Sequence, residues 1–172
     1  MFRNILSIAL LAAFLSLPLS TRAVAGSSNL DLLSFAVGEY DALDNEQAGE
    51  FVLEYRAKSM KWWHISPLAG IMATTDSAVY GFAGIDADFF VSDRFIINPN
   101  FAAGAYSNGD GKNLGRAIEF RSGIGLEYQF NDFSRLGLAI NHISNAHLGD
   151  RNPGTESILV NYAIPVHQLF GR

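Results

Sequence analysis

The stretch RAIEFRSGIGLEYQF, residues 116–130, alternates large apolar residues with charged or small ones along most of its length. One set of alternate positions carries Ile118, Phe120, Ser122, Ile124, Leu126, Tyr128 and Phe130, and the other carries Glu119, Arg121, Gly123, Gly125, Glu127 and Gln129. A period of two residues predicts a β-strand with one apolar and one polar face. Because about 9–11 tilted residues are enough to cross a bilayer, this strand suits a membrane barrel.

Other segments show the same pattern less perfectly and bring the predicted number of strands to eight. They are residues 30–40, 51–58, 62–74, 79–91, 95–106, 135–146 and 155–165. The phase is ambiguous in 62–74, where Pro67 weakens the prediction of a central strand because it has no N–H to donate.

The predicted fold class is all-β, an eight-stranded antiparallel transmembrane β-barrel of the outer membrane. Eight strands make a barrel just wide enough to be filled by its own side chains. The charged residues expected to pair inside it are Glu54, Arg56, Lys58, Asp86, Asp88, Glu119, Arg121 and Glu127. This filling argues against a diffusion pore. Periodicity alone leaves open a soluble lipocalin-like barrel with its apolar face inside, but strand length and aromatic content favour the membrane.

The beginning of the chain has the features of a secretory signal peptide over residues 1–25. Arg3 is followed by a short apolar run, and Ala23-Val24-Ala25 forms a cleavage site. One barrel domain is expected over residues 26–172, in which no apolar run is long enough for a transmembrane helix. The chain has no cysteine, which excludes a disulfide scaffold. The net charge of −5 comes without a basic block, so nucleic acid is not an expected partner.

The lengths of the connections predict how the barrel is oriented. Short links follow the second, fourth and sixth predicted strands, whereas longer polar links follow the first, fifth and seventh. Outer-membrane barrels have short periplasmic turns and longer external loops. We therefore expect both termini in the periplasm of a Gram-negative bacterium and the seventh strand running outward.

The last two predicted strands lie within LGLAINHISNAHLGDRNPGTESILVNYAIPV, residues 136–166, and carry a polar group on an apolar face. His142 and Ser144 share the phase of the leucines and isoleucine before them, and Glu156 shares the phase of the apolar residues after it. Antiparallel neighbours approach to about 5 Å between Cβ atoms, so these three residues can meet. Their chemistry suits acyl transfer, with serine as nucleophile, histidine as base and glutamate orienting the imidazole. Asn145 and Asn152 are candidate donors to the oxyanion.

The segment HISNAHLGDRNPGTES, residues 142–157, resembles the active-site region of the lipid A 3-O-deacylase (PagL) family. The resemblance implies His142 as base, Ser144 as nucleophile and Glu156 as third triad member. It implies Asn152 as the oxyanion-hole side chain, with Asn145 as its support. By this resemblance we expect an outer-membrane serine esterase that hydrolyses the 3-position acyl ester of lipid A in lipopolysaccharide. It would release a 3-hydroxy fatty acid without a metal or cofactor, at a site facing the outer leaflet.

Two other readings explain the signal peptide, strands and loops. One is a non-enzymatic small barrel with a structural or adhesive role, which gives no reason for the shared phase of the three polar residues. The other is a soluble periplasmic lipid-binding barrel. His147 is expected to be a solvated loop residue beside the site. The sequence leaves the formation of a homodimer open.

Overall fold

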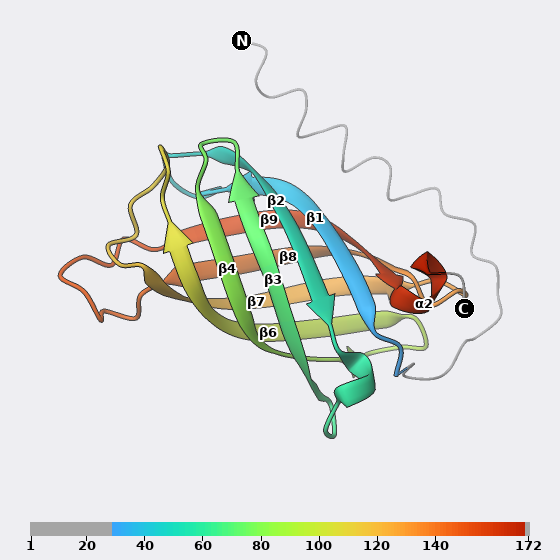
Figure 1. Ribbon diagram of the computed structural model, residues 1–172. Coiled ribbons are helices and arrows are strands. Elements are labelled where there is room, and N and C mark those ends of the chain that lie inside the picture. Colours follow the sequence, from blue (N-terminus) through green and yellow to red (C-terminus); the bar gives the residue numbers. More distant parts are fainter. Residues whose placement is uncertain (1–28, 171–172) are drawn as a thin grey trace, which may run out of the picture.

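The computed structural model describes residues 29–170, which form a closed barrel of eight long antiparallel strands (Figure 1). The long strands are β1 (Leu32–Tyr40), β2 (Ala48–Arg56), β3 (Ile65–Thr74), β4 (Val79–Ala87), β6 (Phe95–Ser107), β7 (Ile118–Gln129), β8 (Arg135–Ser144) and β9 (Thr155–Pro165). The minor elements are β5 (Phe89–Phe90), which pairs with β6, and the short helices η2 (Lys58–Met60) and α2 (Val166–Leu169). Pairing of β1 with β9 and of β4 with β6 closes the ring.

The two ends of the barrel differ in their connections. The end that carries both termini of the described chain, here called the terminal end, has the links 57–64, 88–94 and 130–134. The opposite end, here called the loop end, has the links 41–47, 75–78, 108–117 and 145–154 (Figure 1). The predicted signal peptide and its cleavage site lie outside the described residues. Within residues 29–170, no helix is long and apolar enough to cross a membrane.

The predicted strands are present, with shifts at particular residues. β2 begins at Ala48 rather than at residue 51, and β4 ends at Ala87, before Asp88. Pro67 does lie within β3, because it falls beyond the last β2–β3 pair, Arg56 with Leu68. Its carbonyl accepts a hydrogen bond from the N–H of Ala57 at 2.9 Å. The N–H that proline lacks would point to the same side, where no strand residue needs it.

The barrel presents apolar side chains outward and charged side chains inward. In β7, Ile124 and Leu126 are 53% and 52% exposed, whereas Arg121 and Glu127 are 4% and 1% exposed. A soluble barrel would reverse these faces because water would surround it. The lipocalin-like reading is therefore wrong, and the exterior has the apolar character of a barrel that crosses a membrane.

The terminal half of the interior holds a chain of ion pairs in which positive and negative groups alternate. Its members, in order of contact, are Arg121, Glu54, Arg56, Glu127, Arg135, Asp88, Lys58 and Asp86. The Arg56–Glu127 pair, at 2.6 Å between Nη1 and Oε1, joins β2 to β7 across the interior. Burying such charges is tolerated only because each is paired.

One member of the predicted interior set needs correction, and one residue must be added to it. Glu119 is fully buried as expected, but it forms no ion pair with any other described residue, so it does not join the chain of pairs. The Glu119 side chain lies in the loop half of the interior, where aromatic side chains rather than arginines surround the barrel axis. Arg135, the first residue of β8, is fully buried and takes part in two pairs, although the sequence did not single it out.

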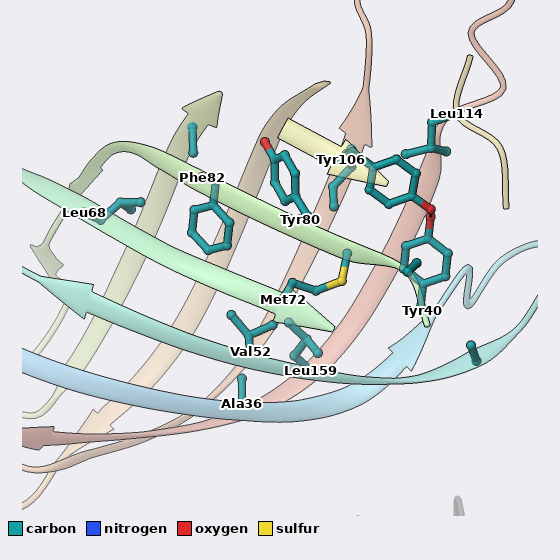
Figure 2. Close-up of a cluster of buried hydrophobic side chains, with 14 residues drawn as sticks. Ala36, Tyr40, Val52, Leu68, Met72, Tyr80, Phe82, Tyr106, Leu114 and Leu159 are labelled. Carbon is teal, nitrogen blue, oxygen red and sulfur yellow. Dashed lines mark hydrogen bonds between the residues drawn. The ribbon is translucent and has the colours of Figure 1, made fainter. Parts of the chain in front are cut away.

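The loop half of the interior is filled mainly by aromatic and aliphatic side chains (Figure 2). Tyr40 and Tyr106 meet through their hydroxyl groups at 2.8 Å, and Leu114 of the link 108–117 covers them from the loop end. An interior void lined by Glu54, Arg121 and their neighbours measures about 30 Å³, room for about one water molecule. The interior is therefore packed, as predicted, and gives no space there for a lipid chain.

Candidate active site

A polar row crosses the apolar exterior near the loop end, over three adjacent strands. Strand register places Ser122 of β7 opposite His142 of β8, and His142 opposite Glu156 of β9. The next outward-facing row toward the terminal end is made of three isoleucines, Ile124, Ile140 and Ile158. The alternation in the sequence predicted Ser122 on the apolar face. Its position opposite His142 follows only from the register of β7 against β8.

His142 and Glu156 form a hydrogen-bonded pair at 2.9 Å between Nδ1 and Oε1. Their side chains remain 46% and 33% exposed. With Nδ1 held by the carboxylate, Nε2 of the imidazole is the nitrogen left to exchange a proton. Gly154 lies against the ring edge with a φ of +67°, and a Cβ there would be 2.9 Å from His142 Cε1. A side chain at residue 154 would therefore displace the imidazole.

Ser144 is the last residue of β8 and lies two residues after His142 on the same outward face. Its side chain is half-buried. Across β7 its partner is Phe120, so Ser144 stands one outward-facing row nearer the loop end than the His142 row. The structure thus brings the predicted base and acid into contact and places the predicted nucleophile beside the base.

A tight turn carries the chain off β8 immediately after Ser144. The N–H of Leu148 donates to the carbonyl of Asn145 at 3.0 Å, and the central residues Ala146 and His147 have φ values of 53° and 61°. Positive φ at both central positions defines a type I′ turn, which normally favours glycine or asparagine. Strained backbone of this kind is held in place by surrounding contacts, and here those contacts come from two asparagines.

Asn145 and Asn152 bind each other and fix the turn. The N–H of Asn145 donates to Oδ1 of Asn152 at 2.9 Å. The Asn145 side chain, fully buried, donates through Nδ2 to the carbonyls of Leu114 and Arg151 at 2.8 and 2.7 Å. Asn145 therefore joins the links 108–117 and 145–154 and binds the side chain of Asn152.

The amide nitrogen of Asn152 lies 3.2 Å from His147 Nδ1. An amide nitrogen carries two hydrogens; His147 accepts one, and the other has no acceptor among the described residues. The prediction of His147 as only a solvated loop residue missed this contact. No signal in the sequence identified it, because it depends on the positive φ of His147 itself.

Lys112 ties the loops over the mouth of the barrel. Its Nζ contacts Asp41 Oδ1 at 2.6 Å and Asp44 Oδ2 at 3.0 Å, while Asp41 also accepts from Thr155, the neighbour of Glu156, at 3.0 Å. Burial alone would lower the pKa of Lys112, but the hydrogen bonds to the two aspartates outweigh it and raise that pKa. The hydrogen bond and charge of Lys112 hold the pKa of Asp44 below its usual value. No pattern in the sequence marks Lys112 for this role.

The fold and the polar row together define a membrane-type β-barrel with a candidate hydrolase site on its outer face. The sequence model of the lipid A 3-O-deacylase (PagL) family matches residues 41–165 of the chain. The chain therefore belongs to this family, as its sequence resemblance predicted.

Individual relatives agree with this assignment. A lipid A deacylase PagL from Bordetella bronchiseptica is 30% identical over 76 residues, which span 43% of this chain and 43% of the relative. The chain matches less than half the length of that curated relative. The crystal structure of the outer membrane enzyme PagL superposes with a TM-score of 0.60 at 24% identity, covering 78% of this chain and 99% of that one.

Two further structures share the fold. A de novo designed transmembrane β-barrel has a TM-score of 0.57 at 11% identity, covering 81% of this chain and 98% of the design. Neisserial surface protein A has a TM-score of 0.50 at 11% identity, covering 81% of this chain and 99% of that one. The barrel fold is thus shared with a designed transmembrane barrel and with a natural surface protein.

Proposed function

We propose that this protein is a serine esterase of the outer membrane that removes the 3-position acyl chain of lipid A. One observation carries the proposal: the His142–Glu156 pair, at 2.9 Å, stands beside Ser144 in a short polar stretch of a mainly apolar exterior. A polar group facing lipid gains nothing from packing. Its presence next to a serine is explained by chemistry at the membrane surface.

The apolar column below the polar row is suited to the acyl chains of the substrate. Ile124, Ile140 and Ile158 are 53%, 53% and 44% exposed, and Leu126 and Leu138 continue the surface toward the terminal end. From Leu136 to His142 the tilted strand climbs about 14 Å. With the loop end outside, the ester of an outer-leaflet glycolipid meets Ser144 at the edge of the hydrocarbon layer, and the substrate need not leave the membrane.

The proposed reaction begins when Ser144 Oγ attacks the ester carbonyl carbon and His142 Nε2 takes the hydroxyl proton. Glu156 holds Nδ1–H and stabilises the imidazolium that forms. We assign the second amide hydrogen of Asn152 to the oxyanion of the tetrahedral intermediate. Collapse breaks the bond to the sugar oxygen at position 3, which leaves with the proton from His142.

An acyl group is then esterified to Ser144. His142 removes a proton from water, the resulting attack forms a second tetrahedral intermediate, and its breakdown releases a 3-hydroxy fatty acid and restores the serine. All three residues of the triad come from β8 and β9 of one chain, so the proposed reaction requires no second copy.

Replacement of two serines separately tests this assignment, because Ser144 and Ser122 both neighbour His142. Ser144→Ala should leave a folded, heat-modifiable barrel without deacylase activity, while Ser122→Ala should keep its activity. The measurement is mass spectrometry of lipid A from cells that express each variant, scored by loss of one 3-hydroxyacyl chain. Full activity of Ser144→Ala would remove the proposed nucleophile, and an inactive wild-type protein would leave the non-enzymatic barrel as the function.

A further inference from the structure

An open groove lies at the loop end between the links 108–117 and 145–154. Its volume is about 520 Å³, and its lining residues are Asn113, Gly115, Arg116, Ala117, Asp150 and Arg151. Two of these are arginines and one is an acid. The groove is separate from the His142–Glu156 pair but shares the link 145–154 with it.

The two links interlock so that both arginines line the same groove. The Arg116 side chain passes over Gly149, where a Cβ would lie 2.8 Å from Arg116 Cγ. Gly115, with a φ of +98°, lies against the backbone of Arg151, where a Cβ would be 2.4 Å from the Arg151 carbonyl oxygen. Each link thus supplies a glycine against which the arginine residue of the other packs. The stem of Arg116 is held by this packing.

The groove arginines differ from those of the barrel interior in their charge balance. Arg56, Arg121 and Arg135 are each paired with carboxylates. By contrast, among residues 29–170 neither Arg116 nor Arg151 forms an ion pair. Asp150 also lines the groove but bonds to neither, so the groove keeps a net positive charge available for an anion.

The groove is connected to the proposed active site through short stretches of backbone. The carbonyl of Arg151 accepts from Asn145 Nδ2 at 2.7 Å, and Arg151 is followed directly by Asn152. Arg116 lies four residues before Phe120, which is the cross-strand partner of Ser144. Four residues of extended chain span about 13 Å between Arg116 and Phe120. The groove therefore stands above the nucleophile, on the side opposite the apolar column.

We propose that Arg116 and Arg151 bind a phosphate group on the sugar headgroup of the glycolipid substrate. This inference rests on the proposed function, since lipid A is a phosphorylated and acylated glucosamine disaccharide. Guanidinium groups match phosphate oxygens with two parallel hydrogen bonds. With acyl chains along the apolar column and a phosphate in the groove, the sugar is held at two points, and the ester between them is presented to Ser144.

Binding to a catalytically silent protein tests the phosphate site without requiring hydrolysis. In the Ser144→Ala background, Arg116→Gln and Arg151→Gln should each weaken binding to detergent micelles containing bisphosphorylated lipid A by about tenfold, the loss of one charge-assisted hydrogen-bonded contact. Binding to micelles of the dephosphorylated glycolipid should not change. Asp150→Asn should tighten binding of the phosphorylated lipid about two- to threefold, because it removes a repulsive charge.

The matched control is Arg94→Gln, which makes the same substitution at the terminal end and should leave both affinities unchanged. Equal losses for phosphorylated and dephosphorylated lipid, or no loss for either, would overturn the inference. A third arm uses inorganic phosphate as competitor. If it displaces lipid A at the concentration expected for a free-phosphate site of equal affinity, the glycolipid is not the ligand that the arginines select.

Hydrolysis by the protein with Ser144 intact separates this inference from the proposed function. The arginine variants should raise KM about tenfold on phosphorylated lipid A and leave kcat within about twofold. Wild-type hydrolysis with unaltered KM in both variants would reject the phosphate site alone. Absent hydrolysis with arginine-dependent binding would reject the esterase and retain a phosphoglycolipid-binding barrel.

Discussion

Strand β8 carries two cationic or basic residues that bind carboxylates in opposite surroundings. Arg135, at the terminal end, faces inward, is fully buried and contacts both Glu127 and Asp88. His142, seven residues later, faces outward and contacts Glu156 with almost half of its side chain exposed. The two residues are an odd number of positions apart, so their side chains point to opposite faces of the barrel.

The comparison shows how the same chemical groups serve two purposes. Inside, charges are paired with several partners, and removing one leaves a buried charge uncompensated. Outside, the histidine has one partner and a free nitrogen, so it contributes little to folding but can exchange a proton. The inward ion pairs of this barrel therefore serve its structure, whereas we assign the outward pair to the proposed reaction.

The largest expected effect separates chemistry from folding at the outward pair. Glu156→Gln should lower kcat for deacylation by about 10³–10⁴-fold with little change in KM, because the imidazolium loses its orienting charge. The unfolding midpoint should barely move, since an exposed pair contributes about 0–1 kcal/mol. Steady-state kinetics and heat-modifiability on gels check both statements. A large loss of stability would mean that the outward pair is structural, which contradicts the comparison.

The converse substitution is made in the chain of buried ion pairs inside the barrel. Glu127→Gln should reduce the free energy of unfolding by about 3–5 kcal/mol, because Arg56 and Arg135 each lose a buried partner. Activity per folded molecule should remain at the wild-type level. Denaturant unfolding in detergent, followed by tryptophan fluorescence, gives the measurement. Glu46→Gln removes an exposed loop carboxylate and is the control that should stay within about 0.5 kcal/mol of wild type.

A third substitution sharpens the comparison within the site. Asn152→Ala removes the proposed oxyanion donor and should lower kcat by about 10²–10³-fold. Asn108→Ala, in the other long link, should leave kcat unchanged, because the only described partner of its side-chain amide is the adjacent Gly109 carbonyl. Single-turnover rates on lipid A distinguish the two. An Asn152→Ala enzyme with wild-type kcat would assign the asparagine to the turn alone.

The smallest effect concerns pH at the loop end. The pKa of Lys112 is raised above 10.5 and that of Asp44 is lowered below 3.8 in the folded protein. The stability from Lys112 is therefore present below its unfolded pKa and lost as pH rises through the folded value. That from Asp44 is present above its unfolded pKa and lost as pH falls through the folded value. The link between residues 41–47 and 112 should persist through neutral pH and loosen at both extremes.

Lys112→Met provides the test of this window. Hydrogen exchange of the amides in residues 41–47 should be slow in wild type at neutral pH and faster in the variant. The difference should correspond to a local opening free energy that is lower by about 1–3 kcal/mol in the variant. The two proteins should converge at strongly alkaline pH. Persistence of a wild-type advantage there would show that the loops are held by other contacts.

Much of the barrel could be predicted because its interior and exterior obey a period of two residues. The faces of β7, β8 and β9 follow from alternation and are confirmed. The ends of strands were less accessible, since Ala48 and Asp88 depend on where a neighbouring strand stops. Arg135 and Glu119 show the same limit, because phase predicts that a charge points inward but does not predict its partner.

The candidate site could be predicted as a set of residues but not as a set of contacts. The phase of His142, Ser144 and Glu156 put them on one face, and the register then joined His142 to Glu156. The support from Leu114 and Lys112 comes from a distant link, and no local pattern encodes it. His147 adopts a left-handed conformation that is uncommon for residues other than glycine, so its contact with Asn152 could not be anticipated.

The alternating interior charges also constrain how the barrel can be assembled. Arg56 reaches Glu127, and Lys58 and Arg135 share Asp88, so groups from both halves of the chain neutralise one another only when the ring is complete. A partly inserted sheet would bring uncancelled ions to hydrocarbon, at a cost of several kcal/mol for each. Closure and insertion are thereby coupled, and a half-made sheet is the least stable form of this chain in a bilayer.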